Sequence, residues 1–170
     1  GFVLAKRQTM LAVLDAGAMY LAGKLSQPTL ITPHAGELAK LLNLRGVQVS
    51  AEAIEGDPRK WVQVASDTLK VTVLLKGPVT FVADSDQLIE LPKATSWLAT
   101  AGTGDVLAGI VAALVATNEV EILNNESILA HVAASAAFIH NTAALNASDG
   151  GPITATEILS FIPQTIKKFI

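Results

Sequence analysis

The sequence contains no cysteine among its 170 residues. Disulfide bonds, thiolate metal sites and a cysteine nucleophile are therefore excluded together, and a reducing compartment is permitted. Charged residues are also scarce, at 16% of the chain against about 25% in an ordinary soluble domain. The formal net charge is -3 and neither sign is gathered into a run, so the sequence carries no electrostatic footprint for nucleic acid or for anionic lipid.

Apolar runs long enough to span a membrane are missing as well. The longest run, residues 106–116, is well short of the roughly 20 apolar residues that a spanning helix needs, and it predicts a buried helix instead. Residues 128–147 are long enough, but His131, His140, Asn141 and other polar side chains are too many for a lipid environment. We therefore expect no membrane partner and a cytoplasmic location.

Hydrophobic residues make up 51% of the chain, which excludes an intrinsically disordered protein. The length fits one domain with a sizeable core, since a chain of about 150 residues buries about two-thirds of its unfolded surface. The sequence starts with Gly1 and runs at once into apolar residues, as in a portion of something longer. We expect residues 1–170 to form a single α/β domain.

Strands and helices are expected to alternate along the chain. Apolar runs predict short strands at 11–14 and 29–31, and each is followed by a predicted helix, at 16–24 and 35–43. Asp15 is placed to cap the first of these helices. Residues 44–57 predict a loop with one helical turn, and a third helix is expected to start at Pro58 and to end near Lys70.

Three closely spaced strands are predicted next, at 71–75, 79–83 and 88–91, and their turn-like separations favour an antiparallel flap. Beyond a loop, the remaining sequence predicts three helices, at 104–117, 125–146 and 154–168. This order predicts an α/β layered fold with a partly parallel sheet covered by helices. Only two clear β-to-α units are present, so a chain that holds just the later strands is expected to leave one side of the sheet exposed.

The most informative segment is Ala101-Gly-Thr-Gly-Asp105, which opens an apolar helix. Glycines let the backbone approach an anion, and the first N–H groups of a helix favour negative charge, so residues 101–104 predict a phosphate or oxyanion seat. Asp105 in the first turn, next to a phosphate, is suited to accept a proton from an attacking hydroxyl. A glycine turn in which Asp105 only caps the helix explains the same residues equally well.

Two further segments carry candidate ligand-binding residues. Lys76-Gly-Pro-Val-Thr80 ends a β-forming run, where a lysine can reach an anion, although a hairpin turn with a solvated lysine is the simpler interpretation. Thr32-Pro-His-Ala-Gly-Glu37 lies between a strand and a helix, in the crevice where open α/β sheets bind ligands. Glu37 is suited to hold Mg²⁺ through water, whereas helix capping by Glu37 with an exposed His34 is the alternative.

Taken in order, the segments TPHAGE (32–37), LLKGPVT (74–80) and ATAGTGDVLAGI (99–110) resemble the ADP/ATP-dependent NAD(P)H-hydrate dehydratase family of the ribokinase-like superfamily. The similarity runs from about residue 11 to the C-terminus. Asp15-Ala-Gly-Ala-Met is similar to the family's Asp-Ala-Asp-Ala-Leu pattern, with Gly17 in place of an aspartate. Members of the family carry further strands and helices before this region, so the resemblance implies the C-terminal portion of a longer ribokinase-like domain.

The resemblance also implies roles for individual residues. His34 contacts the hydrated nicotinamide substrate, and Asp105 faces that substrate as the catalytic base. Glu37 matches the acidic residue that kinases of the superfamily use near Mg²⁺ and phosphate, and His34 replaces their usual asparagine. The implied nucleotide-binding residues are Lys76, Gly77, Pro78, Val79, Thr80 and Gly104, and the implied oxyanion or phosphate seat is Ala101, Gly102, Thr103 and Gly104.

The implied reaction is a metabolite-repair dehydration that restores NADH or NADPH from its hydrate, NAD(P)HX, with Mg²⁺ and with ADP or ATP as co-substrate. Phosphoryl transfer onto the substrate hydroxyl makes a better leaving group than hydroxide. The alternatives are a small-molecule kinase of the same superfamily, which His34 disfavours, and a non-catalytic nucleotide-binding module. The apolar helices from Asn125 onward can pack inside the subunit or between subunits, and a homo-oligomer is expected.

Overall fold

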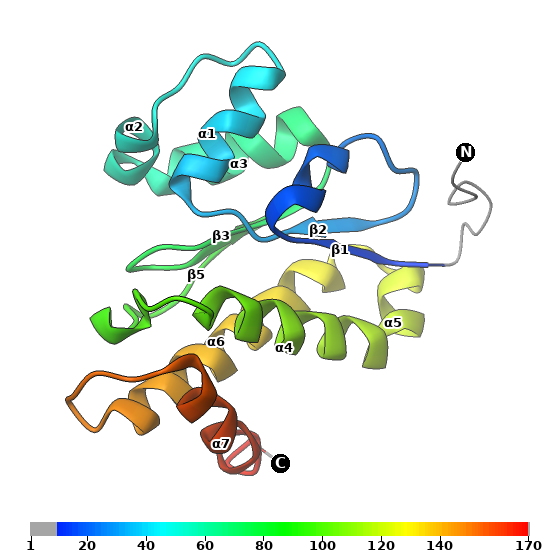
Figure 1. Cartoon of the computed structure of the whole chain (residues 1–170). Coiled ribbons are helices and arrows are strands. Elements are labelled where there is room, and N and C mark those ends of the chain that lie inside the picture. The colour runs from blue at the N-terminus through cyan, green and yellow to red at the C-terminus, as the bar shows by residue number, and fades with distance from the viewer. Residues whose placement is uncertain (1–9, 170) are drawn as a thin grey trace.

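The computed structural model describes residues 10–169, so Gly1 and the rest of 1–9 lie outside the described residues, as does residue 170. One five-stranded sheet has helices on both faces (Figure 1). Its strands, in their order across the sheet, are β1 Ala12–Leu14, β2 Thr29–Ile31, β3 Thr72–Leu75, β4 Phe81–Ala83 and β5 Leu88–Glu90. β1, β2 and β3 pair in parallel, whereas β4 pairs antiparallel with both β3 and β5. This pairing confirms the partly parallel sheet with an antiparallel flap.

The helices fall into two groups about this sheet. They are η1 Ala16–Leu21, α1 Ala35–Leu44, α2 Ala51–Gly56, α3 Pro58–Leu69, η2 Ser96–Leu98, α4 Thr103–Thr117, α5 Glu119–Asn124, α6 Ile128–Ser148 and α7 Ala155–Ile166. In Figure 1, α1 to α3 lie on one face of the sheet, α4 to α6 lie on the other, and α7 lies further out against α6. The short helix α5 was not predicted from the sequence.

Each face of the sheet builds its own hydrophobic core, because successive side chains of a strand point to opposite faces. Ile31 and Val73 pack with α1 and α3, whereas Leu30, Leu74 and Val82 pack with α4 and α6. The expectation of an exposed side is therefore wrong for the central strands, which are covered on both faces. The two edge strands within residues 10–169 are β1, which pairs only with β2, and β5, which pairs only with β4.

The predicted capping role of Asp15 is wrong. The helix that follows is a 3₁₀ helix over residues 16–21, and the Asp15 side chain makes no capping hydrogen bond to it. Ala16 has a φ of 46°, outside the right-handed helical region, so an α-helix cannot begin there. The Asp15 carboxylate instead accepts hydrogen bonds from Thr32 and Lys76.

Helix α6 lies at the centre of the second core. It is the one helix within residues 10–169 whose length and composition would let it cross a membrane, and 56% of its most apolar window is buried inside the protein. His140 on this helix is only 5% exposed, and its Nε2 atom has no hydrogen-bond partner among the described residues. Burial disfavours the charged imidazole and lowers the pKa of His140 to about 4.

We predict that the core leucine Leu38 contributes strongly to folding stability. Leu38 is 0% exposed on α1, so Leu38→Ala should lower the free energy of unfolding by about 2–5 kcal/mol, through lost burial and a residual cavity. The matched control is Leu44→Ala on the same helix, where the side chain is 77% exposed and the expected change is within about 0.5 kcal/mol. Urea unfolding of both variants measures the difference, and equal losses would contradict the assignment of Leu38 to the core.

Folding stability should also fall as the pH drops from 6.5 to 4. The pKa of His140 is 6.5 in its unperturbed state and about 4 when folded, so the unfolded chain takes up a proton that the folded chain refuses. The loss from this group is on the order of 3 kcal/mol once the pH is below 4. The free energy of unfolding, plotted against pH over this range, should have a smaller slope for His140→Asn than for the unaltered protein. The exposed His131, changed to Asn, is the control that should leave the slope unaltered.

Candidate functional site

Three parallel strands end side by side, and the residues that follow them meet at one edge of the sheet. Asp15 comes directly after β1, Thr32 after β2 and Lys76 after β3. Backbone bonds extend the parallel pairing past the strand ends, from Thr32 N to Leu14 O at 3.3 Å and from Lys76 N to Pro33 O at 2.8 Å. This is the crevice in which open α/β sheets bind ligands.

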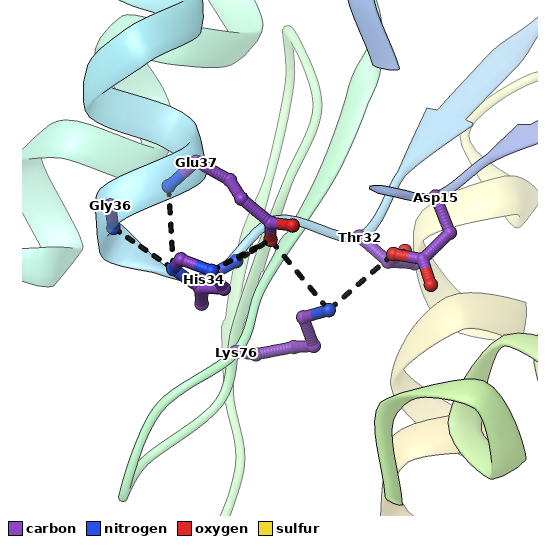
Figure 2. A network of polar contacts seen from close by, with 6 residues as sticks. All are labelled: Asp15, Thr32, His34, Gly36, Glu37 and Lys76. Atoms are coloured by element: carbon purple, nitrogen blue, oxygen red, sulfur yellow. Dashed lines mark hydrogen bonds and ion pairs between the residues drawn. The ribbon is translucent and has the colours of Figure 1, made fainter. Parts of the chain in front are cut away.

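The Lys76 ammonium group lies between two carboxylates (Figure 2). Its Nζ atom is 3.4 Å from Asp15 Oδ1 and 3.9 Å from Glu37 Oε2. The three side chains are only 21–26% exposed, so these contacts are less screened than a pair on the open surface. Residues 76–80 do connect the antiparallel strands β3 and β4 as a hairpin, but the interpretation of Lys76 as a solvated side chain is wrong.

His34 and Glu37 form the capping box of α1. Nδ1 of His34 accepts hydrogen bonds from the backbone N–H groups of Gly36 and Glu37, at 3.1 and 3.3 Å, and Oε2 of Glu37 accepts one from the backbone N–H of His34 at 2.9 Å. Because Nδ1 acts as an acceptor, a neutral His34 carries its ring proton on Nε2. The His34 side chain is 59% exposed, so the capping and ligand-facing interpretations of this residue are compatible.

The N-terminus of α4 faces the same region. Gly102 is its N-cap with a φ of 86°, and a Cβ there would lie 3.2 Å from Cβ of Ala155, so both backbone conformation and space favour glycine. A glycine cap offers no side chain to the first N–H groups; that of Thr103 donates to Thr100 O at 3.4 Å, and those of Gly104 and Asp105 remain available to an anion. A Cβ on Gly104 would lie 3.5 Å from Lys76 Nζ, so the ammonium group stands at the first turn of α4.

A cleft of about 760 Å³ joins these parts, a volume within the usual range of about 300–1,000 Å³ for ligand pockets. The structure brings most of the predicted residues together in its lining, namely His34, Lys76, Gly77, Pro78, Thr80, Thr103 and Gly104. Apolar side chains such as Leu98 and Leu107 complete the wall. The lining thus combines the Lys76 ammonium group, whose charge is balanced by Asp15 and Glu37, with apolar side chains elsewhere.

Other predicted residues lie outside the lining of this cleft. Val79 packs against the core under α1 and α3, and Ala101 and Gly102 are exposed. Asp105 is exposed in the first turn of α4. Successive residues of a helix are turned by about 100°, so Asp105 points to a different side of α4 from Thr103 and Leu107, which line the cleft.

Sequence reasoning missed several residues of the cleft, among them three with an ammonium, imidazole or amide side chain that can meet a ligand. Lys93 adds a second cation from the loop after β5, and His140 and Asn141 contribute from α6. Lys93 lay in a predicted loop and carried no motif that distinguished it from other surface lysines. His140 was interpreted as a core or surface histidine, and it is both buried and part of the cleft wall.

The carboxylates of Glu37 and Asp15 are suited to hold Mg²⁺ in one particular way. Within residues 10–169 there is no group of three or more His, Asp or Glu residues that could hold a metal ion by itself. Mg²⁺, however, is commonly bound by one or two carboxylates together with phosphate oxygens of a substrate. The hard oxygen donors beside Lys76 fit such a shared site, with the remaining ligands coming from a bound nucleotide.

The chain is similar to proteins of related function from several organisms. The ADP-dependent (S)-NAD(P)H-hydrate dehydratase of Cenarchaeum symbiosum is 34% identical over 161 residues, which are 92% of this chain and 52% of that protein. The bifunctional NAD(P)H-hydrate repair enzyme of Mycobacterium tuberculosis (strain ATCC 25618 / H37Rv) is 46% identical over 99 residues, which are 57% of this chain and 19% of that protein. The chain therefore spans about half the length of the first relative and about a fifth of the second.

Solved structures share the fold. The ADP/ATP-dependent NAD(P)H-hydrate dehydratase from Bacillus subtilis, co-crystallized with ATP/Mg²⁺, has a TM-score of 0.76 at 24% identity over 95% of this chain and 56% of that one. A ribokinase-like superfamily protein from Enterococcus faecalis has a TM-score of 0.74 at 23% identity over 96% of this chain and 54% of that one. The predicted ribokinase-like fold is confirmed. The family model of NAD(P)H-hydrate dehydratase matches residues 1–164, and the chain accordingly belongs to the NAD(P)H-hydrate dehydratase family.

Proposed function

We propose that this chain takes part in the nucleotide-dependent dehydration of NAD(P)HX to NADH or NADPH. The observation that carries the proposal is the cleft in which Lys76, Gly104 and His34 meet, in a chain that belongs to the dehydratase family. The cleft combines the Lys76 ammonium group and backbone amides with an apolar wall, and a nucleotide has the matching combination of phosphates and a flat base.

The phosphates of ADP or ATP are proposed to occupy the Lys76 end of the cleft. Lys76 supplies a charge-assisted hydrogen bond, and the N–H groups of Gly104 and Asp105 at the start of α4 supply fixed dipoles for the transferred phosphoryl group. Gly77, Pro78 and Thr80 line the cleft beside this end. Val79 lies outside the lining and is proposed to contact the nucleotide through its backbone only. The apolar stretch at Leu98 and Leu107 suits the base.

Asp105 is proposed to act at the start of α4, directly after Gly104, which lines the nucleotide cleft. Its carboxylate lies outside the nucleotide cleft, in the first helical turn, and this position supports a role toward a second molecule. There it accepts the proton of the substrate hydroxyl while that oxygen receives the phosphoryl group, and the nucleotide leaves one phosphate shorter. The substrate then loses inorganic phosphate from one carbon and a proton from the neighbouring carbon, which forms the double bond and completes the dehydration. His34, with its ring proton on Nε2, is proposed to contact the nicotinamide ring.

Mg²⁺ is proposed to be held by Glu37, directly or through water, with Asp15 nearby. When bound, the ion neutralises charge on the nucleotide phosphates during transfer. The Bacillus subtilis relative was co-crystallized with ATP/Mg²⁺, which supports the same pairing of nucleotide and ion here. The preference between ADP and ATP stays open in this proposal.

A cytoplasmic homo-oligomer is proposed as the working form. The exposed apolar side chains of α6 and α7, which include Phe138, Leu145 and Leu159, support contacts between subunits. Residues 1–170 are further proposed to act as one ribokinase-like domain, or as part of a longer one.

The proposed reaction predicts that the protein restores NADH absorbance when it is incubated with hydrated NADH, Mg²⁺ and ADP or ATP. Asp105→Asn should lower the turnover rate by about 10²- to 10⁴-fold, because the base is lost, and should leave ADP binding unchanged. Asp149→Asn at the exposed C-terminal end of α6 is the matched control. A phosphorylated product without NADH would favour the kinase, ADP binding without either product would favour the non-catalytic module, and normal dehydration by Asp105→Asn would overturn the assignment of the base.

The phosphate site predicts that Lys76→Met weakens the binding of MgADP by about 10- to 100-fold, because one hydrogen bond from a charged group is worth about 1.5–3 kcal/mol. Lys40→Met on the exposed side of α1 is the control, and its affinity should match that of the unaltered protein. Titration calorimetry measures both values. Equal affinities for the Lys76 and Lys40 variants would contradict the proposed position of the phosphates.

A further inference from the structure

Thr32 is the first residue of the TPHAGE segment, and the proposed reaction gives it no role. It directly follows β2, the middle one of the three parallel strands, whereas the residue that pairs with Lys76 is His34, two positions further along. Thr32 is only 1% exposed, and its hydroxyl donates a hydrogen bond of 2.6 Å to Asp15 Oδ1. A buried hydroxyl with one short bond to a carboxylate has a defined direction.

The same carboxylate oxygen serves two donors. Oδ1 of Asp15 accepts from the Thr32 hydroxyl and also lies 3.4 Å from Lys76 Nζ (Figure 2). Asp15 is followed directly by the 3₁₀ helix η1, which its side chain does not cap, so its own segment supplies no side-chain bond that would hold the carboxylate in place. The orientation of Asp15 toward Lys76 therefore depends on the hydroxyl of Thr32.

Lys76 in turn needs a defined position to meet a phosphate. Its ammonium group lies next to Gly104 in the first turn of α4. A lysine side chain that is free in water has many rotamers. Asp15 and Glu37 restrict that freedom from two sides. A binding group held in place by packed and hydrogen-bonded neighbours loses less entropy on binding its ligand.

We infer that Thr32 is a positioning residue, which orients Asp15 and through it holds Lys76 for the phosphate groups of a nucleoside di- or triphosphate. The inference rests on the proposed nucleotide site and adds a residue that contacts neither phosphate nor base. The inference predicts a selective effect: loss of the Thr32 hydroxyl weakens the binding of ligands that carry phosphates and leaves the binding of the corresponding nucleoside unchanged.

The test compares the affinities of MgADP and of adenosine for the full chain, by titration calorimetry. Thr32→Val keeps the shape of the side chain and removes the hydroxyl. It should weaken the binding of MgADP by about tenfold, which is less than the roughly 10²-fold loss that a misplacement of about 1 Å can cause. Adenosine binding should not change. Thr32→Ser restores the hydroxyl and should restore the affinity for MgADP.

Thr29→Val is the matched control. Thr29 stands at the other end of the same strand, is 4% exposed, and donates its hydroxyl to Gln27 O at 2.8 Å. Its replacement removes an equally buried hydrogen bond far from Lys76 and should leave the affinity for MgADP unchanged. Weakening by Thr29→Val equal to that by Thr32→Val would indicate a general structural effect and overturn the inference.

A double-mutant cycle isolates the route through Lys76. In the Lys76→Met background, Thr32→Val should change the affinity for MgADP by less than about twofold, because the group that Thr32 positions is gone. An undiminished tenfold effect in that background would overturn the inference, as would unchanged MgADP binding by Thr32→Val alone or equal weakening of adenosine. Failure of the unaltered chain to bind MgADP would overturn the nucleotide site itself, and this outcome is distinct from the others.

Discussion

The parallel pairing of β1, β2 and β3 is the constraint on which the site depends. Because the three strands run in the same direction and in register, the residues that follow them are delivered to one edge of the sheet. Asp15, Thr32 and Lys76 occupy these positions although they are far apart in the chain. A cation then stands between two carboxylates, one at the end of β1 and one in the first turn of α1, and both elements are fixed by packing against the hydrophobic cores.

The second half of the site comes from the helices that cover the sheet. Helix α4 packs against α6 over an apolar surface, and this packing sets where its N-terminus points. Gly102 begins the helix in a left-handed conformation and leaves its first N–H groups without a capping side chain. Lys76 reaches the same turn from the sheet, so a strand end and a helix start act together on an anion. Neither part alone would define a site for phosphate.

Much of the fold could be predicted from local sequence. The strands at 29–31 and 72–75 are buried along their whole length because both faces of the sheet are covered, and all their residues after the first threonine are apolar. The capping box at Thr154 and Glu157 is formed by neighbours on the helix. The capping role of Asp15 was wrongly predicted because helix caps are inferred from the next few residues alone. The actual partners of Asp15 lie 17 and 61 residues along the chain.

The sequence by itself determined the alternation of strands and helices, the glycines at the start of α4 and the family to which the chain belongs, because these features depend on spacing between near neighbours. Tertiary structure decided that Lys76 lies between Asp15 and Glu37, that His140 enters the wall of the cleft, and that Asp105 points away from it. Those outcomes follow from strand register and helix packing, which join residues across long connections and leave no periodic signal in the sequence.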